Sequence, residues 1–111
     1  MGSLSRTTLA ALIAGSMLVS AGNALADFAS GKDLLQWCNS NDYEKEKCLG
    51  YIMGVADMMR YSIVSGWKAC AAPAVQVRDV TIQFLQLHPE YRHLDGAGLV
   101  AEAIGRAFPC Q

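Results

Sequence analysis

With 111 residues and a formal charge of −1, the chain is long enough for one small domain and carries no excess of basic residues. The length argues against a multidomain protein. The balance of charge gives no positive surface for nucleic acid or for an anionic membrane. We therefore expect neither as a partner.

The first 26 residues have the pattern of a secretory signal peptide. Arg6 supplies a positive start, residues 9–21 are apolar, and Ala24, Leu25 and Ala26 form an A-x-A cleavage site. The apolar stretch is too short and too broken to span a bilayer. We expect residues 1–26 to be removed on export.

Residues 27–111 then form a single mature domain, which we expect to be soluble, without a membrane anchor, in an oxidising compartment. Removing Arg6 leaves eight basic and ten acidic residues, a net charge of −2. Residues 49–67 do not read as a membrane span, because Asp57 and Arg60 lie in the middle of them.

Four cysteines fall in the mature part: Cys38, Cys48, Cys70 and Cys110. An even number after a signal peptide predicts two disulfides. Zinc binding is the competing interpretation. The sequence has no C-x-x-C pair, and neither His88 nor His93 is spaced with the cysteines as a ligand set. We expect no metal site.

Apolar periodicity predicts about four helices in the mature part. Ser30 can cap the first helix, with Asp33 three residues later completing a capping box. Residues 39–42 form a turn that is rich in Asn, Ser and Asp. Asp42 can cap a second helix, which we expect to run to about Ser65.

This second helix should be the central helix of the core. Its apolar stripe comprises Cys48, Tyr51, Ile52, Val55, Met59 and Ile63. Gly50 and Gly54 lie one turn apart within it, and each costs roughly 1 kcal/mol relative to Ala in a helix interior. We expect another helix to approach closely at these two glycines.

Residues 75–88 are ambiguous, because the β-branched side chains favour a strand while the spacing of Val77, Phe84 and Leu85 favours a helix. We predict a helix that Pro89 ends. The apolar stripe of a fourth helix follows: Leu94, Ala97, Ala101, Ile104 and Phe108. Its three glycines weaken it in isolation, so packing must hold it. The predicted fold is a compact all-α bundle with two disulfides.

The helix ends favour one disulfide pairing among the three that four cysteines allow. Cys38 ends the first helix and Cys48 begins the second, while Cys70 precedes the third and Cys110 follows the fourth. These positions are neighbours in antiparallel hairpins, which favours Cys38–Cys48 and Cys70–Cys110. In the chain-entropy model the two closed loops contribute about 3 and about 4 kcal/mol.

Residues with catalytic potential are few. A nucleophile beside a base, a paired carboxylate site or a metal set is not apparent, so we expect neither an enzyme nor a cofactor. His88 and His93 are interpreted as surface or capping residues. Asp57 and Arg60, one turn apart, are interpreted as an ion pair.

The candidate for partner binding is the segment of residues 66–73, tied at Cys70 and stiffened at Pro73. Trp67 would anchor a partner, because tryptophan is common among residues that dominate binding energy. Lys68 would set orientation and association rate. Packing of Trp67 at the edge of the core is the alternative interpretation.

Five motifs cover nearly the whole mature chain. They are GKDLLQWC at 31–38, CLGYIMGVAD at 48–57, Cys70 with Pro73, QFL at 83–85 followed by HPE at 88–90, and AFPC at 107–110. In their order and spacing the chain resembles the Rap/Tai family of periplasmic immunity proteins, which protect bacteria from type VI secretion amidase effectors. The segment after Cys70 departs from the family pattern, which is commonly Cys-x-Pro followed by a polar helix start with Thr. This chain has two alanines between Cys70 and Pro73, and the apolar Ala74 and Val75 follow the proline.

The resemblance implies a compact helical fold, a periplasmic location and frequent homodimers. It also implies inhibition of an amidase that cuts peptide cross-links in peptidoglycan, by occlusion of its active site. An alternative from a different class is a small periplasmic chaperone or stress protein that exposes apolar surface conditionally.

Overall fold

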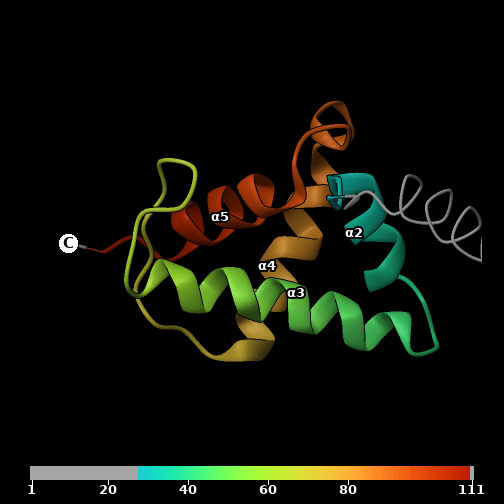
Figure 1. The fold of residues 1–111 in the computed structure, drawn as a ribbon, viewed down its shortest axis with the longest axis horizontal. Helices are drawn as coiled ribbons and strands as arrows, with labels where there is room; N and C mark the ends of the chain where they lie inside the picture. The colour runs from blue at the N-terminus through green and yellow to red at the C-terminus, as the bar shows by residue number, and fades with distance from the viewer. Residues whose placement is uncertain (1–27, 111) are drawn as a thin grey trace, which may run out of the picture.

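A computed structural model describes residues 28–110 and shows them as a bundle of α-helices (Figure 1). Within these residues the elements are α2 (Gly31–Cys38), α3 (Glu44–Met59), α4 (Ala74–Leu87), the 3-10 helix η1 (Pro89–Tyr91) and α5 (Gly96–Ala107). The predicted all-α fold is confirmed. The predicted signal peptide, residues 1–26, lies outside the described residues.

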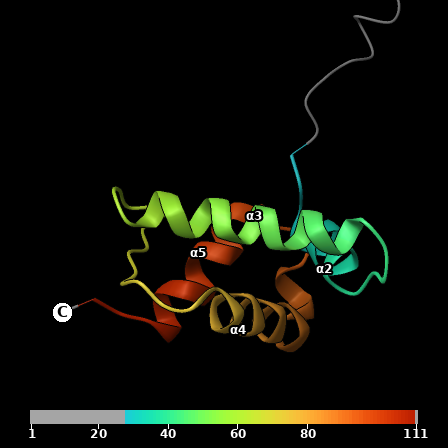
Figure 2. The same cartoon turned by 90° about the horizontal axis from the view of Figure 1, so that it is seen from below.

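The core lies where the four α-helices meet. Seen from below, α3 runs along one side of the bundle and α4 along the other (Figure 2). The large side chains with less than 2% of their surface exposed are Leu34, Ile52, Met59, Leu85, Val100 and Ile104. Each α-helix contributes at least one of them, so each helix is held by the same apolar core.

The start of α2 is fixed by the predicted capping box. The Ser30 hydroxyl accepts from the backbone N–H of Asp33 at 3.2 Å, and the backbone N–H of Ser30 donates to the Asp33 carboxylate at 3.0 Å. The backbone N–H and the hydroxyl of Ser30 both donate to the Asp33 carboxylate, and these two hydrogen bonds lower the pKa of Asp33 below its ordinary value. The side chains of Ser30 and Asp33 therefore satisfy two backbone N–H groups at the start of α2.

The end of α3 differs from the prediction, because the helix stops at Met59 rather than near Ser65. Ser65 and Gly66 have φ values of 49° and 84°, and Val64 and Trp67 exchange backbone hydrogen bonds of 3.0 and 2.8 Å across them. Two successive positive φ angles are typical of a type I′ turn. This turn reverses the chain and is incompatible with a continuing α-helix.

The predicted close approach at Gly50 and Gly54 is wrong. A Cβ atom built on either residue meets nothing within 4 Å, so both glycines face solvent. The buried stripe of α3 was placed correctly on Cys48, Ile52 and Met59. Gly50 and Gly54 lie two residues before and after Ile52, which puts them on the opposite side of an α-helix.

Close approach occurs instead at α5. A Cβ atom on Gly105 would lie 2.7 Å from Cε3 of Trp67, and one on Gly96 would lie 2.9 Å from the carbonyl oxygen of Ala29. At its start the Asp95 side chain accepts from the backbone N–H of Gly98 at 3.0 Å. The expectation that packing holds this glycine-rich helix is confirmed.

The ambiguous third segment is helical, as predicted. α4 starts after Pro73 without a side-chain cap. At its other end, the backbone N–H of His88, the residue after the helix, donates to the Phe84 carbonyl. The buried hydroxyl of Thr81 donates to the Val77 carbonyl at 2.8 Å. The β-branched side chains of this segment are therefore accommodated on a helix because tertiary packing outweighs their local preference.

The predicted disulfide pairing is also confirmed. Cys38 bonds to Cys48 and Cys70 to Cys110, with Cα atoms 4.9 and 5.0 Å apart. The first links the end of α2 to the first turns of α3, and the second links the segment before α4 to the end of the described chain. In the part of the chain that the structure describes, we find no helix long and apolar enough to cross a membrane.

Candidate functional site

The connection between α3 and α4, residues 60–73, projects past the end of α3 as a loop (Figure 1). Trp67 is half-buried and lies against Gly105 of α5, while the guanidinium of Arg106 sits 5.1 Å from the centre of its ring. A guanidinium over an indole ring is a favourable cation–π arrangement. Trp67 therefore fastens the loop to α5.

The rest of the loop carries side chains in solvent. Ile63 is 66% exposed, and Lys68 and Pro73 are exposed as well. Of the three residues predicted to bind a partner, Lys68 and Pro73 are accessible, while Trp67 adopts the packing that was the alternative interpretation. Sequence reasoning missed Ile63, because it continues the apolar stripe of α3 at helical spacing.

Both ends of the loop are restrained. The backbone N–H of Cys70 donates to the Phe108 carbonyl at 3.0 Å, next to the Cys70–Cys110 disulfide. The turn at Ser65 and Gly66 is closed by the paired hydrogen bonds of Val64 and Trp67. A loop restrained in this way loses little conformational entropy when it binds a partner.

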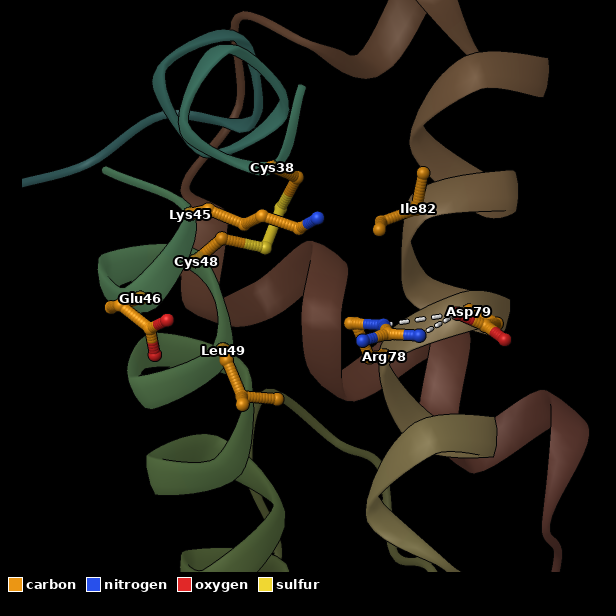
Figure 3. A pocket seen from close by; sticks show the side chains of 8 residues that line it. All are labelled: Cys38, Lys45, Glu46, Cys48, Leu49, Arg78, Asp79 and Ile82. Carbon is orange, nitrogen blue, oxygen red and sulfur yellow. Dashed lines mark hydrogen bonds and ion pairs between the residues drawn. A yellow bond between two sulfur atoms is a disulfide. The ribbon is translucent and has the colours of Figure 1, made fainter. Parts of the chain in front are cut away.

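A groove of about 320 Å³ opens between the first turns of α3 and the middle of α4 (Figure 3). The residues that line it are Cys38, Lys45, Glu46, Cys48, Leu49, Arg78, Asp79 and Ile82. Lys45 extends from α3 toward the gap between the helices (Figure 3). The Nε of Arg78 donates to the Asp79 carboxylate at 3.0 Å, so that this guanidinium is already paired.

The groove offers charges of both signs and a disulfide, with no free thiol and no histidine in its lining. In residues 28–110 we find no group of three or more His, Cys, Asp or Glu side chains that could hold a metal ion. These side chains provide charged and apolar contacts. The groove is thus suited to contact with another molecule.

The histidines lie at and after the end of α4. His88 Nδ1 is 3.0 Å from a carboxylate oxygen of Glu90, and its ring stacks on Tyr91 with centres 5.0 Å apart. The hydrogen bond from His88 lowers the pKa of Glu90. His88 therefore packs at the junction of α4 and η1, whereas His93 is exposed.

Asp57 and Arg60 do not form the expected ion pair. Both side chains are exposed, and the ion pairs of the described residues are Arg78 with Asp79, His88 with Glu90, and Arg106 with Glu102. The pair of Arg106 and Glu102 spans one helical turn, and Arg106 also lies over the Trp67 ring.

The features described so far are those of a small protein-binding domain: a disulfide-linked helical bundle with a restrained, exposed loop. The family model of the Rap1a immunity proteins matches residues 30–110, so the chain belongs to this family. A comparison with curated proteins found no match. Membership, together with the two disulfides, indicates an extracytoplasmic immunity protein that acts against a toxin effector.

Proposed function

We propose that this protein binds a type VI secretion peptidoglycan amidase in the periplasm and blocks the amidase active site. Two observations support the proposal. The chain belongs to an immunity family, and its disulfides suit an oxidising compartment such as the periplasm, where peptidoglycan lies. An immunity protein against such a toxin has to be in that compartment to meet it.

The observation that carries the mode of inhibition is the restrained loop of residues 60–73. An enzyme cleft is concave, and a projecting segment that is already ordered can enter it at low entropic cost. The loop is held by Trp67 against Gly105 and by the Cys70–Cys110 disulfide. It presents Ile63 and Lys68 to solvent.

In this proposal each residue has a separate role. Ile63 supplies apolar contact inside the cleft, and Lys68 steers the encounter through its charge. Trp67 positions the loop through its contact with α5. Pro73 fixes the backbone where the loop passes into α4.

Binding of loop variants to an amidase toxin from the same organism tests the proposal. Ile63→Asp places a charge in the contact and should raise the dissociation constant at least about tenfold. Lys68→Glu should mainly slow association, by an amount that falls as salt rises. Val75→Asp is the matched control, since Val75 is 58% exposed on α4 outside the loop, and it should bind like the parent.

Equal affinities for the parent and the Ile63→Asp variant would show that the loop is not the contact. A circular dichroism spectrum for each variant separates loss of contact from loss of fold. If Ile63→Asp binds normally, the turn of residues 89–94 is the next segment to substitute.

Export is also proposed, because residues 1–26 have the pattern of a signal peptide. Amino-terminal sequencing of the protein from a periplasmic fraction should begin at Asp27. A protein that retains Met1 and stays in the cytoplasm would contradict the periplasmic part of the proposal.

A further inference from the structure

The groove of Figure 3 lies at the opposite end of α3 from the loop of residues 60–73. It opens beside the first turns of α3, whereas the loop begins after the last turn. Its volume of about 320 Å³ falls within the roughly 300–1,000 Å³ that is typical of small-molecule sites. The groove therefore has room for a small ligand at a place separate from the proposed inhibitory loop.

One part of the groove wall is apolar. Leu49 of α3 and Ile82 of α4 line the groove from the two helices, and both side chains are half-buried. The disulfide of Cys38 and Cys48 also belongs to the lining, at the junction of α2 and α3. The part of Leu49 and Ile82 that remains exposed is apolar surface, and a ligand that covers it gains hydrophobic stabilisation. A ligand that fits the groove therefore carries a short aliphatic portion.

A second part of the wall carries positive charge. Lys45 extends from α3 into the gap and Arg78 lies between α3 and α4, whereas Glu46 points away from α4 (Figure 3). Lys45 belongs to none of the ion pairs found in residues 28–110. Its ammonium is therefore available to a ligand that carries a negative charge, and opposite charges at this distance attract.

Arg78 adds donors that its own partner does not use. Its Nε and Nη2 atoms both lie 3.0 Å from the same carboxylate oxygen of Asp79. A guanidinium has five N–H groups, so this pairing leaves those of Nη1 for a second acceptor. In residues 28–110, Nη1 makes no hydrogen bond. A carboxylate can accept both from this guanidinium and from the ammonium of Lys45, and such charge-assisted hydrogen bonds are strong.

We propose that this groove binds a stem peptide of peptidoglycan. A stem peptide carries several carboxylates on short aliphatic residues, so it matches both parts of the wall, whereas an inorganic anion leaves the apolar part uncovered. In the complex one carboxylate lies between Lys45 and Arg78, and the adjoining carbons cover Leu49 and Ile82. The inference rests on the proposed function for the compartment, because peptidoglycan is the material that the toxin cuts. Binding holds the inhibitor at the substrate of the toxin and leaves the loop accessible.

An NMR titration with the tripeptide L-alanyl-γ-D-glutamyl-meso-diaminopimelate tests the site. The parent should bind with a dissociation constant below about 1 mM, and the shift changes should centre on Leu49 and Ile82. Lys45→Glu places a negative charge in the gap and should raise the dissociation constant at least about tenfold. Lys47→Glu is the matched control, because Lys47 is exposed on the same helix outside the groove lining. It should bind the tripeptide like the parent.

Two further ligands identify the chemistry that the groove recognises. The same tripeptide with its carboxylates converted to carboxamides should not bind, because it has lost the charges that pair with Lys45 and Arg78. The peptide L-alanyl-L-glutamyl-L-lysine has one carboxylate fewer and should bind more weakly than the stem tripeptide. Equal binding of this peptide would show that the groove accepts any acidic peptide, which would overturn the assignment to peptidoglycan.

The inhibitory loop is tested separately with Ile63→Asp, which should bind the tripeptide like the parent even where it no longer binds the toxin. Loss of the tripeptide in this variant would overturn the proposed location of the site. The proposal is also overturned if the parent shows no shift changes up to about 10 mM tripeptide, if Lys45→Glu binds like the parent, or if Lys47→Glu loses as much affinity as Lys45→Glu. Circular dichroism spectra establish that each variant is folded.

Discussion

Two glycines on different helices show how the surroundings of a single residue decide the effect of a methyl group. Gly54 is in the interior of α3 with open space around its missing side chain, whereas Gly105 of α5 lies against Trp67. In an exposed helix interior, alanine is favoured because glycine loses more backbone entropy on folding. Against a rigid indole ring, the same methyl group has no room.

Gly54→Ala should therefore raise the free energy of unfolding by about 0.5–1 kcal/mol. Gly105→Ala should lower it by about 1–3 kcal/mol, because Trp67 has to move. Urea unfolding of the parent and of each variant measures both changes. A destabilising Gly54→Ala would show that this face of α3 is covered in the folded protein.

At the level of the element, the capping box of α2 gives a stability that depends on pH. Asp33 has a pKa below its ordinary value of 3.8 because it accepts hydrogen bonds from Ser30. The stabilisation is therefore present above that ordinary value, and it is lost as the pH falls through the lower pKa of the folded state.

Ser30→Ala removes the hydroxyl cap and should cost about 1 kcal/mol at neutral pH. The difference in unfolding free energy between the parent and this variant should narrow in acid, as Asp33 becomes protonated. Ser62→Ala is a suitable control, since Ser62 bonds only the Met58 carbonyl at the end of α3 and involves no carboxylate. Denaturation at a series of pH values checks the effect; a constant difference down to pH 2 would contradict it.

The elements also show what the sequence could predict. The capping box at Ser30, the break at Pro89 and the pairing of the cysteines depend on local chemistry or on helix ends, and each was predictable. The end of α3 was not, because Ile63 continues the helical apolar spacing from Met59. The chain reverses at Ser65 and Gly66, where both φ angles are positive, and Trp67 then packs on α5 against Gly105, a contact between residues distant in the sequence.

The candidate site could be predicted only in part, because some of its contacts join residues that are distant in the sequence. The loop around Lys68 and Pro73 was identified, because proline and a nearby cysteine are local signals. The role of Trp67 depends on Gly105, a residue distant in the sequence, and the groove of Figure 3 is lined from three helices. A glycine pair such as Gly50 and Gly54 permits close approach but does not show that a neighbour makes it, and in the described chain none does.

At the scale of the whole molecule, two disulfides support a small core. The Cys38–Cys48 link joins residues 10 apart in the sequence and the Cys70–Cys110 link joins residues 40 apart. In the chain-entropy model, their loss costs about 3 and about 4 kcal/mol respectively. Pairwise Cys→Ala variants, unfolded in urea, should follow this order. Greater loss in the Cys38/Cys48 variant would show that the shorter link stabilises by another mechanism.

The proposed function is inhibition of an amidase toxin by blocking of its active site. The most direct test titrates the purified protein into an amidase toxin from the same organism and measures cleavage of peptidoglycan cross-links. Inhibition should be complete when there is one chain per toxin molecule, and the Ile63→Asp variant should need a large excess. Full cleavage at a concentration where the two proteins form a complex would contradict occlusion, and the absence of any complex would contradict the proposed partner.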